Sequence, residues 1–394
     1  MTNLRAGSAN DLLAAVMELR GGERVIACYQ CATCSGSCPT APAMDYTPRH
    51  ILHMLRLGLG ERVLRSRAIW LCTSCYSCTA RCPREIKITD AIIGLRRLAV
   101  ERGLDLPVTL TTLRDTIVTC NNISGDDNTT RLIWSENLEG DILAFRGKRQ
   151  AEVAFYVGCV ASFYPTVYGI PQAMVQVMDR AGVDFATLGG DEWCCGYPLF
   201  SAGMEGLMAG LMAHNVDRVR EMGAKTLVTT CPSCHYTWSH LYPQLDPARL
   251  DFEVLHASQF LARLLEEGRL KLASLEQVVT YHDPCDLGRK SGIFDAPRQV
   301  IEAMPGVEFR EMDASRENAL CCGGGGDVQI VDESVTAAVA DRRLGQAQRT
   351  GARVLLSACQ QCKRTLMAAA RREKARMRVM DLAELVWQSM EGEA

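Results

Sequence analysis

Eighteen of the 19 cysteines in this 394-residue chain fall into four regular groups of two kinds. Two groups read C-x2-C-x2-C-x3-C-P and comprise Cys28, Cys31, Cys34 and Cys38, and then Cys72, Cys75, Cys78 and Cys82. The other two read Cys, then Cys-Cys-Gly, then C-x2-C, and comprise Cys159, Cys194, Cys195, Cys231 and Cys234, and then Cys285, Cys321, Cys322, Cys359 and Cys362. Thiolates at such fixed intervals are typical ligands of soft, polynuclear metal centres, so we expect a chain that carries electrons.

Cysteine at this density has three explanations. Disulfide scaffolds are typical of small secreted domains, whereas this chain is long, has an odd number of cysteines and lacks a secretory pattern over Met1 to Arg20. Zinc sites use C-x2-C pairs, but they do not require the longer run or adjacent ligating cysteines. Iron–sulfur clusters fit both patterns, and they predict a reducing, anaerobic cytoplasm as the setting.

Composition narrows the classes of partner. The net charge of −3, from 43 basic and 46 acidic residues, leaves no basic excess, so nucleic acid is not expected as a partner. The uncharged stretch from Val153 to Met178 is long enough to span a membrane. Gly158, Pro165 and Pro171 interrupt it, so we expect a buried strand, a loop and a helix there. We therefore expect no integral membrane protein, with peripheral association left open.

Hydrophobic periodicity and cysteine spacing divide the chain into five predicted segments: a leading helix (1–22), a dicluster ferredoxin-like domain (23–103), a connector (104–150) and two repeated domains (151–270 and 271–394). Apolar residues at helical spacing over 48–64 and 89–103 make the dicluster domain helical around its cysteine groups. The connector has weak periodicity and many turn-forming residues.

The second half of the chain contains an internal repeat. Cys159 to Cys285 is 126 residues, Cys194 to Cys321 is 127, and Cys231 to Cys359 is 128. In each copy one apolar run precedes the first cysteine and another precedes the C-x2-C, with a helical stretch before the second run: 153–157, 204–222 and 226–229, and then 278–281, 334–348 and 353–356. This order predicts parallel α/β layers with ligands at the carboxyl ends of strands. The predicted class is an α+β multidomain fold.

The ferredoxin-type groups indicate two cubane [4Fe-4S] clusters. When two such groups occur, the fourth cysteine, before proline, ligates the cluster of the other group. We therefore assign Cys28, Cys31, Cys34 and Cys82 to cubane one, and Cys72, Cys75, Cys78 and Cys38 to cubane two.

These motifs resemble a known family. The first hundred residues, with CYQCATCSGSCP and WLCTSCYSCTARCP, resemble the C-type subunit of heterodisulfide reductase, and the remainder resembles the B-type subunit with its CCG domains. Together they resemble the fused, D-type form over nearly the whole chain. CCG domains also occur in glycolate oxidase, lactate utilisation, anaerobic glycerol-3-phosphate dehydrogenase and aromatic-ring reductase complexes, so the fold is better indicated than the reaction.

The resemblance implies that each five-cysteine motif binds a noncubane [4Fe-4S] cluster. Many relatives have lost cysteines from one motif, whereas this chain retains all ten, which favours a thiol–disulfide centre. Breaking a disulfide requires two electrons, and two facing clusters would each supply one. Because the chain has no flavin or nicotinamide fingerprint, the expected partner is a flavin-containing A-type subunit or another electron-donating protein, with a disulfide or thiol as substrate.

Other residues near the motifs are candidates for supporting roles. His235, beside Cys234, and His282, three residues before Cys285, are candidate proton donors, and ordinary packing is the alternative for both. The run Gly323–Gly326 lacks the Lys-Ser/Thr of a phosphate loop, so we expect close backbone approach to a cluster or substrate. Cys120, outside every group, is expected to be a buried thiol.

Three functional hypotheses follow. The first is a disulfide reductase subunit, and the second is a non-catalytic electron-transfer subunit between a flavoprotein and another oxidoreductase or a quinone. In the third, one CCG site holds zinc, as its C-x2-C permits.

Overall fold

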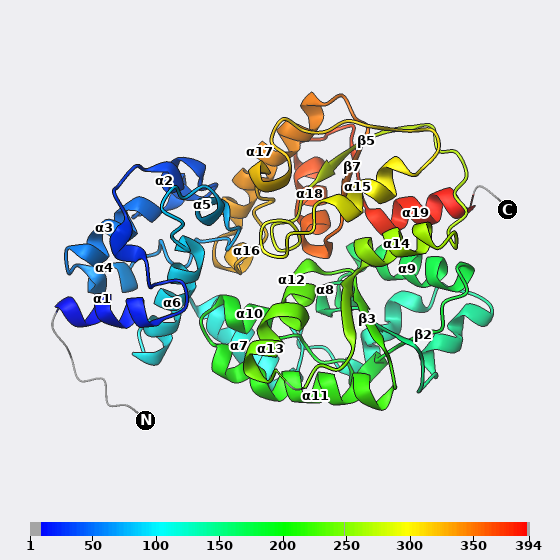
Figure 1. The fold of residues 1–394 in the computed structure, drawn as a ribbon, viewed down its shortest axis with the longest axis horizontal. Coiled ribbons are helices and arrows are strands. Elements are labelled where there is room, and N and C mark those ends of the chain that lie inside the picture. The colour runs from blue at the N-terminus through cyan, green and yellow to red at the C-terminus, as the bar shows by residue number, and fades with distance from the viewer. Residues whose placement is uncertain (1–8, 248, 392–394) are drawn as a thin grey trace. The chain divides into compact units, whose positions relative to one another are not determined.

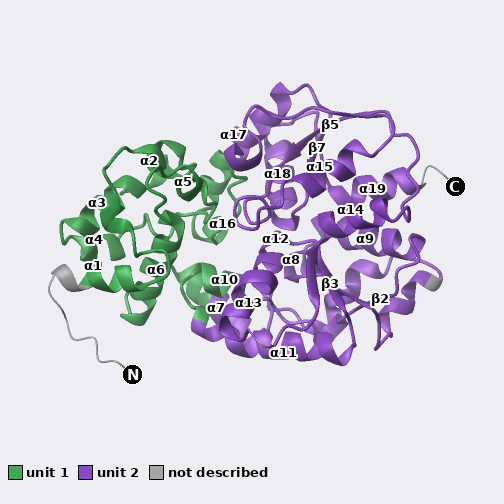
Figure 2. Cartoon of the chain, viewed as in Figure 1, with its two compact units in different colours: residues 1–112, 198–205, 320–339 green, residues 113–197, 206–319, 340–394 purple. Residues whose placement is uncertain are grey.

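The computed structural model describes residues 9–247 and 249–391, which form two compact units (Figures 1 and 2). Unit 1 comprises residues 1–112, 198–205 and 320–339, and unit 2 comprises residues 113–197, 206–319 and 340–394. The segments 198–205 and 320–339 belong to the two repeats in sequence, yet they cluster with unit 1. Residues 1–8 of the predicted leading segment lie outside the described part of the chain.

Unit 1 is helical around its cysteine loops, as the apolar spacing predicts. Its helices are α1 (Ala9–Glu18), α2 (Thr33–Ser37), α3 (Pro48–Arg56), α4 (Gly60–Leu64), α5 (Ser77–Ala80), α6 (Ile88–Glu101) and α16 (Val328–Val331), with 3-10 turns η1 (Val25–Ala27) and η2 (Ala41–Ala43). The expected helix over 48–64 is two helices, because Gly58 at φ 73° ends α3. Leu59, expected on the buried face, is 39% exposed.

Unit 2 contains two four-stranded parallel sheets with the same strand order. The orders are β2-β1-β3-β4 and β6-β5-β7-β8, which confirms the internal repeat. The strands are β1 (Val153–Tyr156), β2 (Phe185–Thr187), β3 (Thr226–Thr229), β4 (Glu253–His256), β5 (Gln277–His282), β6 (Val307–Phe309), β7 (Val354–Ser357) and β8 (Arg378–Asp381). The central strands β1 and β7 are buried at every position, as expected for strands covered on both faces.

The helices of unit 2 cover these sheets. In the first repeat they are α8 (Cys159–Phe163), α9 (Gly169–Arg180), α10 (Tyr197–Ser201, which continues into unit 1), α11 (Met208–Glu221), α12 (Pro232–Tyr236), the π-helix η8 (Thr237–Leu241), α13 (Tyr242–Leu245) and α14 (Ala257–Glu266). In the second they are α15 (Asp295–Glu302), α17 (Glu333–Arg349, which begins in unit 1), α18 (Gln360–Arg372) and α19 (Leu382–Glu391). Short 3-10 turns at η5 (Pro165–Val167), η6 (Gly189–Asp191), η7 (Glu205–Leu207) and η9 (Arg316–Asn318) join them.

The two repeats pack reciprocally. Helix α9 of the first repeat packs on α19 of the second, and α14 of the first packs on α15 of the second. Since α9 and α15 each follow the first strand of their repeat, and α14 and α19 each end theirs, the two contacts are equivalent around a pseudo-twofold axis. Buried side chains of both repeats, including Phe155 and Val279, share one core.

The uncharged stretch from Val153 to Met178 forms β1, α8, the turn η5 and most of α9, as expected from its glycines and prolines. Its buried residues belong to the shared core of unit 2. Among the described residues, none of the helices combines the length and the apolar character that a membrane crossing requires.

The predicted connector has more regular structure than its weak periodicity indicates. It contains α7 (Val108–Cys120) and two 3-10 helices, η3 (Asn128–Ser135) and η4 (Asp141–Arg146). Trp134 of η3 is fully buried in the core of unit 2 and stacks on Phe145 with ring centroids 5.7 Å apart. The segment after residue 113 is therefore an integral part of unit 2.

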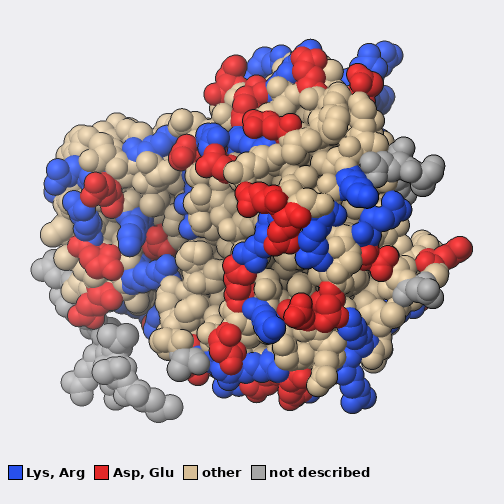
Figure 3. Space-filling view, turned by 45° about the vertical axis from the view of Figure 1, so that its right-hand side comes forward, with Lys and Arg blue, Asp and Glu red and all other residues tan. Residues whose placement is uncertain are grey.

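Acidic and basic side chains are interspersed on the face drawn in Figure 3. The protein has surface ion pairs, such as Arg263 with Glu253 at 2.7 Å and Arg220 with Asp251 at 3.1 Å. Exposed pairs of this kind contribute little stability.

Candidate metal centres

The structure exchanges the fourth cysteines of the two ferredoxin-type groups. Cys82, from the second group, lines one small cavity of unit 1 together with Cys28, Cys31 and Cys34. Cys38, from the first group, lies beside the second: burial, with the Cys75 and Cys72 thiols, raises its pKa to about 12. This is the arrangement that the assignment of cubanes one and two requires.

The two loops share one backbone conformation. Gln30 and Ala32 in the first loop have φ of 66° and 67°, and Ser74 and Tyr76, at the same places in the second, have φ of 51° and 60°. Non-glycine residues seldom adopt positive φ, so its recurrence at both places marks a constrained loop. In each loop the residues with positive φ lie between the cysteines of the group.

The glycine run after Cys322 approaches one of these loops within unit 1. A Cβ atom on Gly326 would lie 2.2 Å from the Cys72 carbonyl oxygen, and one on Gly325 would lie 2.7 Å from that of Thr73. Gly326 also has φ of 62°, which favours glycine. The run thus makes a close backbone approach to the loop of Cys72, and an approach to a cluster or substrate stays a prediction.

The first five-cysteine set converges within unit 2. Cys159 begins α8 just after β1, Cys194 and Cys195 follow η6, and Cys231 and Cys234 follow β3. All five are buried, and side-chain hydrogen bonds link Cys159 to Cys194, Cys194 to Cys195, Cys195 to Cys234, and Cys231 to Cys234. The predicted set is therefore brought together at the carboxyl ends of parallel strands.

The pKa values of these thiols are shifted in opposite directions. Hydrogen bonds from Cys194 and Cys234 lower the pKa of Cys195 to about 5. A hydrogen bond to Cys194, together with burial, holds the pKa of the Cys159 thiol well above its usual range. A thiolate is the form that binds metal, so a buried set in which one member ionises readily is chemically suited to a polynuclear thiolate-ligated centre.

The second set lies partly in each unit. Cys285, Cys359 and Cys362 follow β5 and β7 in unit 2, and the Cys359 sulfur accepts a hydrogen bond from the Cys362 amide at 3.4 Å. Cys321 and Cys322 belong to the segment of unit 1, where their sulfurs accept from the Gly323 and Gly324 amides at 3.3 and 3.5 Å. Nine of the ten CCG cysteines are buried, and Cys285 is half-buried.

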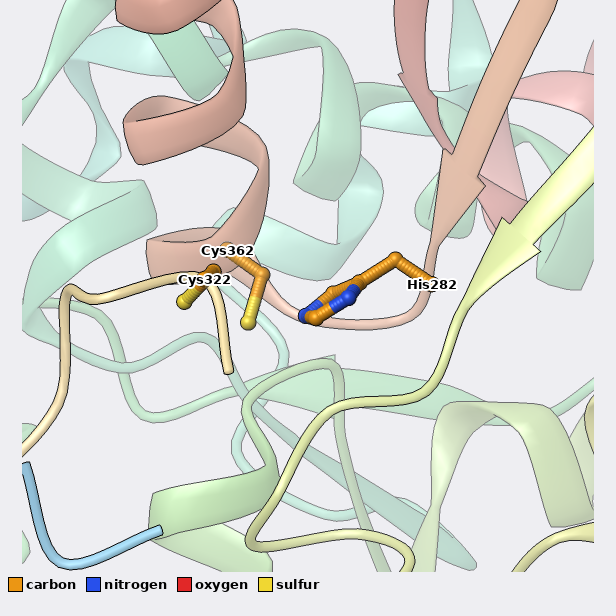
Figure 4. Close-up of side chains that lie close together, drawn as sticks. All are labelled: His282, Cys322 and Cys362. Atoms are coloured by element: carbon orange, nitrogen blue, oxygen red, sulfur yellow. The ribbon is translucent and has the colours of Figure 1, made fainter. Parts of the chain in front are cut away.

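The two candidate proton donors have different surroundings. A ring nitrogen of His282 lies within 4.8 Å of the Cys362 sulfur, and Figure 4 shows both side chains directed to the same space. Its Nδ1 accepts a hydrogen bond from the Arg343 guanidinium at 2.9 Å, so the ring proton is on Nε2. The ring is therefore neutral and can donate from Nε2.

His235 has the contacts of a packing residue. Its ring lies 6.5 Å from that of His240 and 6.1 Å from that of His256, and its Nε2 is 3.3 Å from the Ser239 hydroxyl. Burial, with the charge of His240, lowers the pKa of His235 to about 4. A proton-donor role for either histidine stays a prediction. Cys120, expected to be buried, is half-buried.

Several residues beside the first set were not singled out from the sequence. Buried Arg131 donates to the Cys159 sulfur at 3.2 Å and to Glu192 at 2.8 Å. Glu192 in turn accepts from the amides of Val157 and Gly158, each at 2.9 Å. Asn215 of α11 binds the main chain of Trp193 and Cys194. These contacts fix the backbone around the adjacent cysteines, but the sequence separations conceal them.

Two links join the loops of the two repeats. Asp286, next to Cys285, accepts from Ser233 at 2.6 Å and from Tyr197 at 3.2 Å, and it pairs with the Lys290 ammonium at 2.7 Å. Each of these residues adjoins a cysteine motif, which is the sequence signal that could have identified them.

The second link is the Gln360 side chain, between Cys359 and Cys362. It donates to the Val157 carbonyl at 2.7 Å and to the Thr230 hydroxyl at 2.8 Å, and it accepts from the Ala161 amide at 3.0 Å. Gln360 is fully buried, and its side-chain amide makes its hydrogen bonds to the first repeat although it lies in the C-x2-C of the second.

Comparison with known proteins agrees with this architecture. A 4Fe-4S dicluster domain matches residues 24–86, and a cysteine-rich CCG domain matches residues 153–238 and 279–367. A solved structure, a hypothetical protein from Helicobacter pylori, has a TM-score of 0.56 at 10% identity, covering 96% of this chain and 74% of that one, which shows likeness of fold alone.

Curated relatives are similar over most of the chain. The D-type subunit of the dihydromethanophenazine:CoB–CoM heterodisulfide reductase of Methanosarcina mazei is 34% identical over 323 residues, covering 81% of this chain and 77% of that protein. Its counterpart in Methanosarcina acetivorans is 33% identical over the same shares of the two chains. An EtfAB:quinone oxidoreductase of Syntrophomonas wolfei is 30% identical, covering 84% of this chain and 47% of that protein.

The dicluster domain, the paired CCG domains and these relatives confirm the predicted fold class and an iron–sulfur protein of the oxidoreductase type. The chain belongs to the family of D-type heterodisulfide reductase subunits.

Proposed function

We propose that the chain is the iron–sulfur subunit of a heterodisulfide-reductase-like complex. Electrons from a flavin-containing A-type subunit, or another electron-donating protein, would pass through cubanes one and two to two noncubane [4Fe-4S] clusters that reduce, or reversibly form, a disulfide. The observation that carries this proposal is the convergence of five buried thiols, Cys159, Cys194, Cys195, Cys231 and Cys234, within a repeat whose strand order recurs around the second set.

The residues around the second set support chemistry on a sulfur substrate. When bound, the two noncubane clusters would each supply one electron to the disulfide. Within unit 2, Cys285 is half-buried, whereas Cys359 and Cys362 are buried. His282 carries its N–H on Nε2, because Nδ1 accepts from the Arg343 guanidinium, and it would donate a hydrogen bond from Nε2 that stabilises a departing thiolate, whose proton comes from solvent.

Disulfide cleavage by the iron-loaded protein tests the proposal. With an artificial one-electron reductant, the protein is expected to cleave at least one small dithiol-derived or mixed disulfide, as measured by thiol release. Variant H282Q should slow turnover while leaving the iron content unchanged. If every disulfide in a broad panel stayed intact, the reductase assignment would fail.

A non-catalytic electron-transfer role is the second candidate, favoured by the similarity to the EtfAB:quinone oxidoreductase. Electron paramagnetic resonance after thiol oxidation separates the two roles. A reductase should show a CCG-cluster signal that depends on added thiol or disulfide, whereas a pure relay should show the same spectrum with and without substrate.

Metal analysis tests the number of clusters. Four [4Fe-4S] centres require about sixteen irons per chain, with matching sulfide. One zinc per chain, with about four fewer irons, would instead place zinc in one CCG site.

A further inference from the structure

The first cysteine of each repeat accepts a hydrogen bond from an arginine. Arg131 donates from Nη2 to the Cys159 sulfur at 3.2 Å, and Arg289 donates from Nη2 to the Cys285 sulfur at 3.0 Å. Cys159 and Cys285 are equivalent positions, since each follows the first strand of its repeat. The same kind of contact therefore exists at both sites of the repeated fold.

The two arginines come from unrelated places in the sequence. Arg131 lies in η3, 28 residues before Cys159 and outside the repeat, whereas Arg289 lies four residues after Cys285 within it. Duplication of one repeat cannot have copied this contact from one site to the other. Two separate origins for one guanidinium–sulfur contact indicate that each site requires it.

The surroundings of Arg131 fix its orientation. Its side chain is 1% exposed, its Nη1 binds Glu192, its Nε donates to Asn128 at 3.0 Å, and the guanidinium lies 4.9 Å from the Phe163 ring centroid. Burying a guanidinium is costly unless anions and acceptors surround it. A thiolate at Cys159 would complete that set and would make the N–H···S contact a charge-assisted bond.

Arg289 is fixed by main-chain acceptors. Its Nη1 donates to the carbonyl oxygens of Glu317 at 3.2 Å and Ala319 at 2.6 Å, and these residues precede the cysteine pair of the second repeat. The guanidinium thus connects the loop of Cys285 to the chain that leads to Cys321. These two main-chain acceptors hold the guanidinium charge beside the Cys285 sulfur.

We propose that Arg131 and Arg289 are positioning residues that set the reduction potential of the two CCG clusters through the first cysteine of each. Adding one electron to a cluster increases its negative charge, part of which resides on the ligating sulfurs. A guanidinium held at one sulfur stabilises the reduced form more than the oxidised form and raises the potential. The inference rests on the proposed function only in that a cluster occupies each CCG site, and it does not depend on disulfide cleavage.

Redox titration of the full-length, iron-loaded protein, followed by electron paramagnetic resonance, tests this role. Because R131M alone would leave Glu192 buried without its cation, R131M/E192Q is compared with E192Q. Relative to E192Q, we expect the double variant to lower the equilibrium constant for one-electron reduction of one CCG cluster at least tenfold. This change corresponds to a reduction potential lower by about 59 mV. R289M should do the same to the other signal, and R131K and R289K should restore most of each loss.

The matched control is R146M, since Arg146 is an exposed arginine of the same segment that binds the Ser135 hydroxyl. It should leave both potentials unchanged. Unchanged potentials in R131M/E192Q and in R289M, with iron content and signals intact, would overturn the inference while leaving the proposed function in place. Absence of CCG-cluster signals from the wild type would overturn both proposals. Shifted potentials without disulfide cleavage would support the role proposed for the two arginines and overturn the proposed disulfide reductase function.

Discussion

Single buried polar side chains carry much of the specificity of this site. Gln360 uses both ends of its amide, and all three of its partners belong to the loops of the first repeat. Arg131 and Glu192 are almost fully buried and satisfy one another together with the main chain around Cys159. None of these roles follows from spacing, because each depends on partners that the fold brings from distant parts of the chain.

Replacing Gln360 by leucine should destabilise unit 2. The change leaves the Val157 carbonyl, the Thr230 hydroxyl and the Ala161 amide buried without their partner, so we expect a loss of about 2–5 kcal/mol in the free energy of unfolding. Chemical denaturation of the metal-free protein measures it. The control is Q361L, because Gln361 is only half-buried and binds within α18. Equal losses for the two variants would contradict the role given to Gln360.

Asp381 should make stability depend on pH. Burial, with the nearby Glu384, raises its pKa to about 7 from an ordinary value near 4. Between these values the unfolded chain releases the proton while the folded chain keeps it, so this group destabilises the fold increasingly as the pH rises from about 4 to 7. Variant D381N should therefore gain up to about 4 kcal/mol relative to the wild type between about pH 4 and pH 8. A pH-independent difference in unfolding free energy would contradict this.

At the scale of elements, the sequence predicts the central features better than the outer ones. Apolar runs identify β1, β3, β5 and β7, but β2 and β6 have only three residues each, and β4 and β8 begin with the charged residues Glu253 and Arg378. Helix α7 is rich in Thr and Val, which have low helix propensity, and packing of Leu110 and Ile117 overrides that preference.

The cysteine groups were the most predictable elements, since ligand spacing reflects the cluster rather than the fold. Cys82 lies with the first loop and Cys38 beside the second, which is consistent with the exchange, and the assignment of ligands to cubanes one and two stays a prediction. The glycine run was also anticipated, but its partner, the loop of Cys72, was not, because that contact joins segments far apart in the sequence.

Gly326→Ala should disturb that contact. A methyl group would lie 2.2 Å from the Cys72 carbonyl oxygen at a residue with φ of 62°. We expect a loss of more than about 1 kcal/mol in stability, and a lower iron content because the Cys72 loop must shift. G345A is the control: Gly345 lies in α17 with open space around its Cβ position, and the change should stabilise the helix by about 0.5–1 kcal/mol. Iron analysis and thermal unfolding distinguish the two.

At the scale of the whole molecule, unit 2 has one core formed by two repeats, and contacts between the repeats join loops that carry cysteine motifs. The Lys290 side chain is fully buried, lies 4.7 Å from the Tyr197 ring centroid and pairs with Asp286. Asp286 in turn holds Ser233 of the first C-x2-C. The ion pair thus lies where the loop of Cys285 contacts the first C-x2-C.

Lys290→Met should uncouple these loops. It leaves the Asp286 carboxylate partly buried without its cation, so we expect a loss of about 3–5 kcal/mol, of which K290M/D286N should recover a substantial part. A double-mutant cycle in chemical denaturation measures the coupling. Additive losses would show that Lys290 and Asp286 do not stabilise one another, contrary to the ion pair.

The reciprocal packing of α9 on α19 and α14 on α15 has a consequence for ancestry. A single repeat of this kind presents both of the helices that form these contacts, and a second copy of the repeat would bury both of them. This packing is the arrangement expected of a homodimer whose two copies were joined into one polypeptide. Within one polypeptide the two halves can differ in sequence. One has Cys-Pro-Ser-Cys and the other Cys-Gln-Gln-Cys, and the arginine that contacts the first cysteine comes from a different part of the chain in each half. A symmetric dimer could not have given its two sites different surroundings in this way.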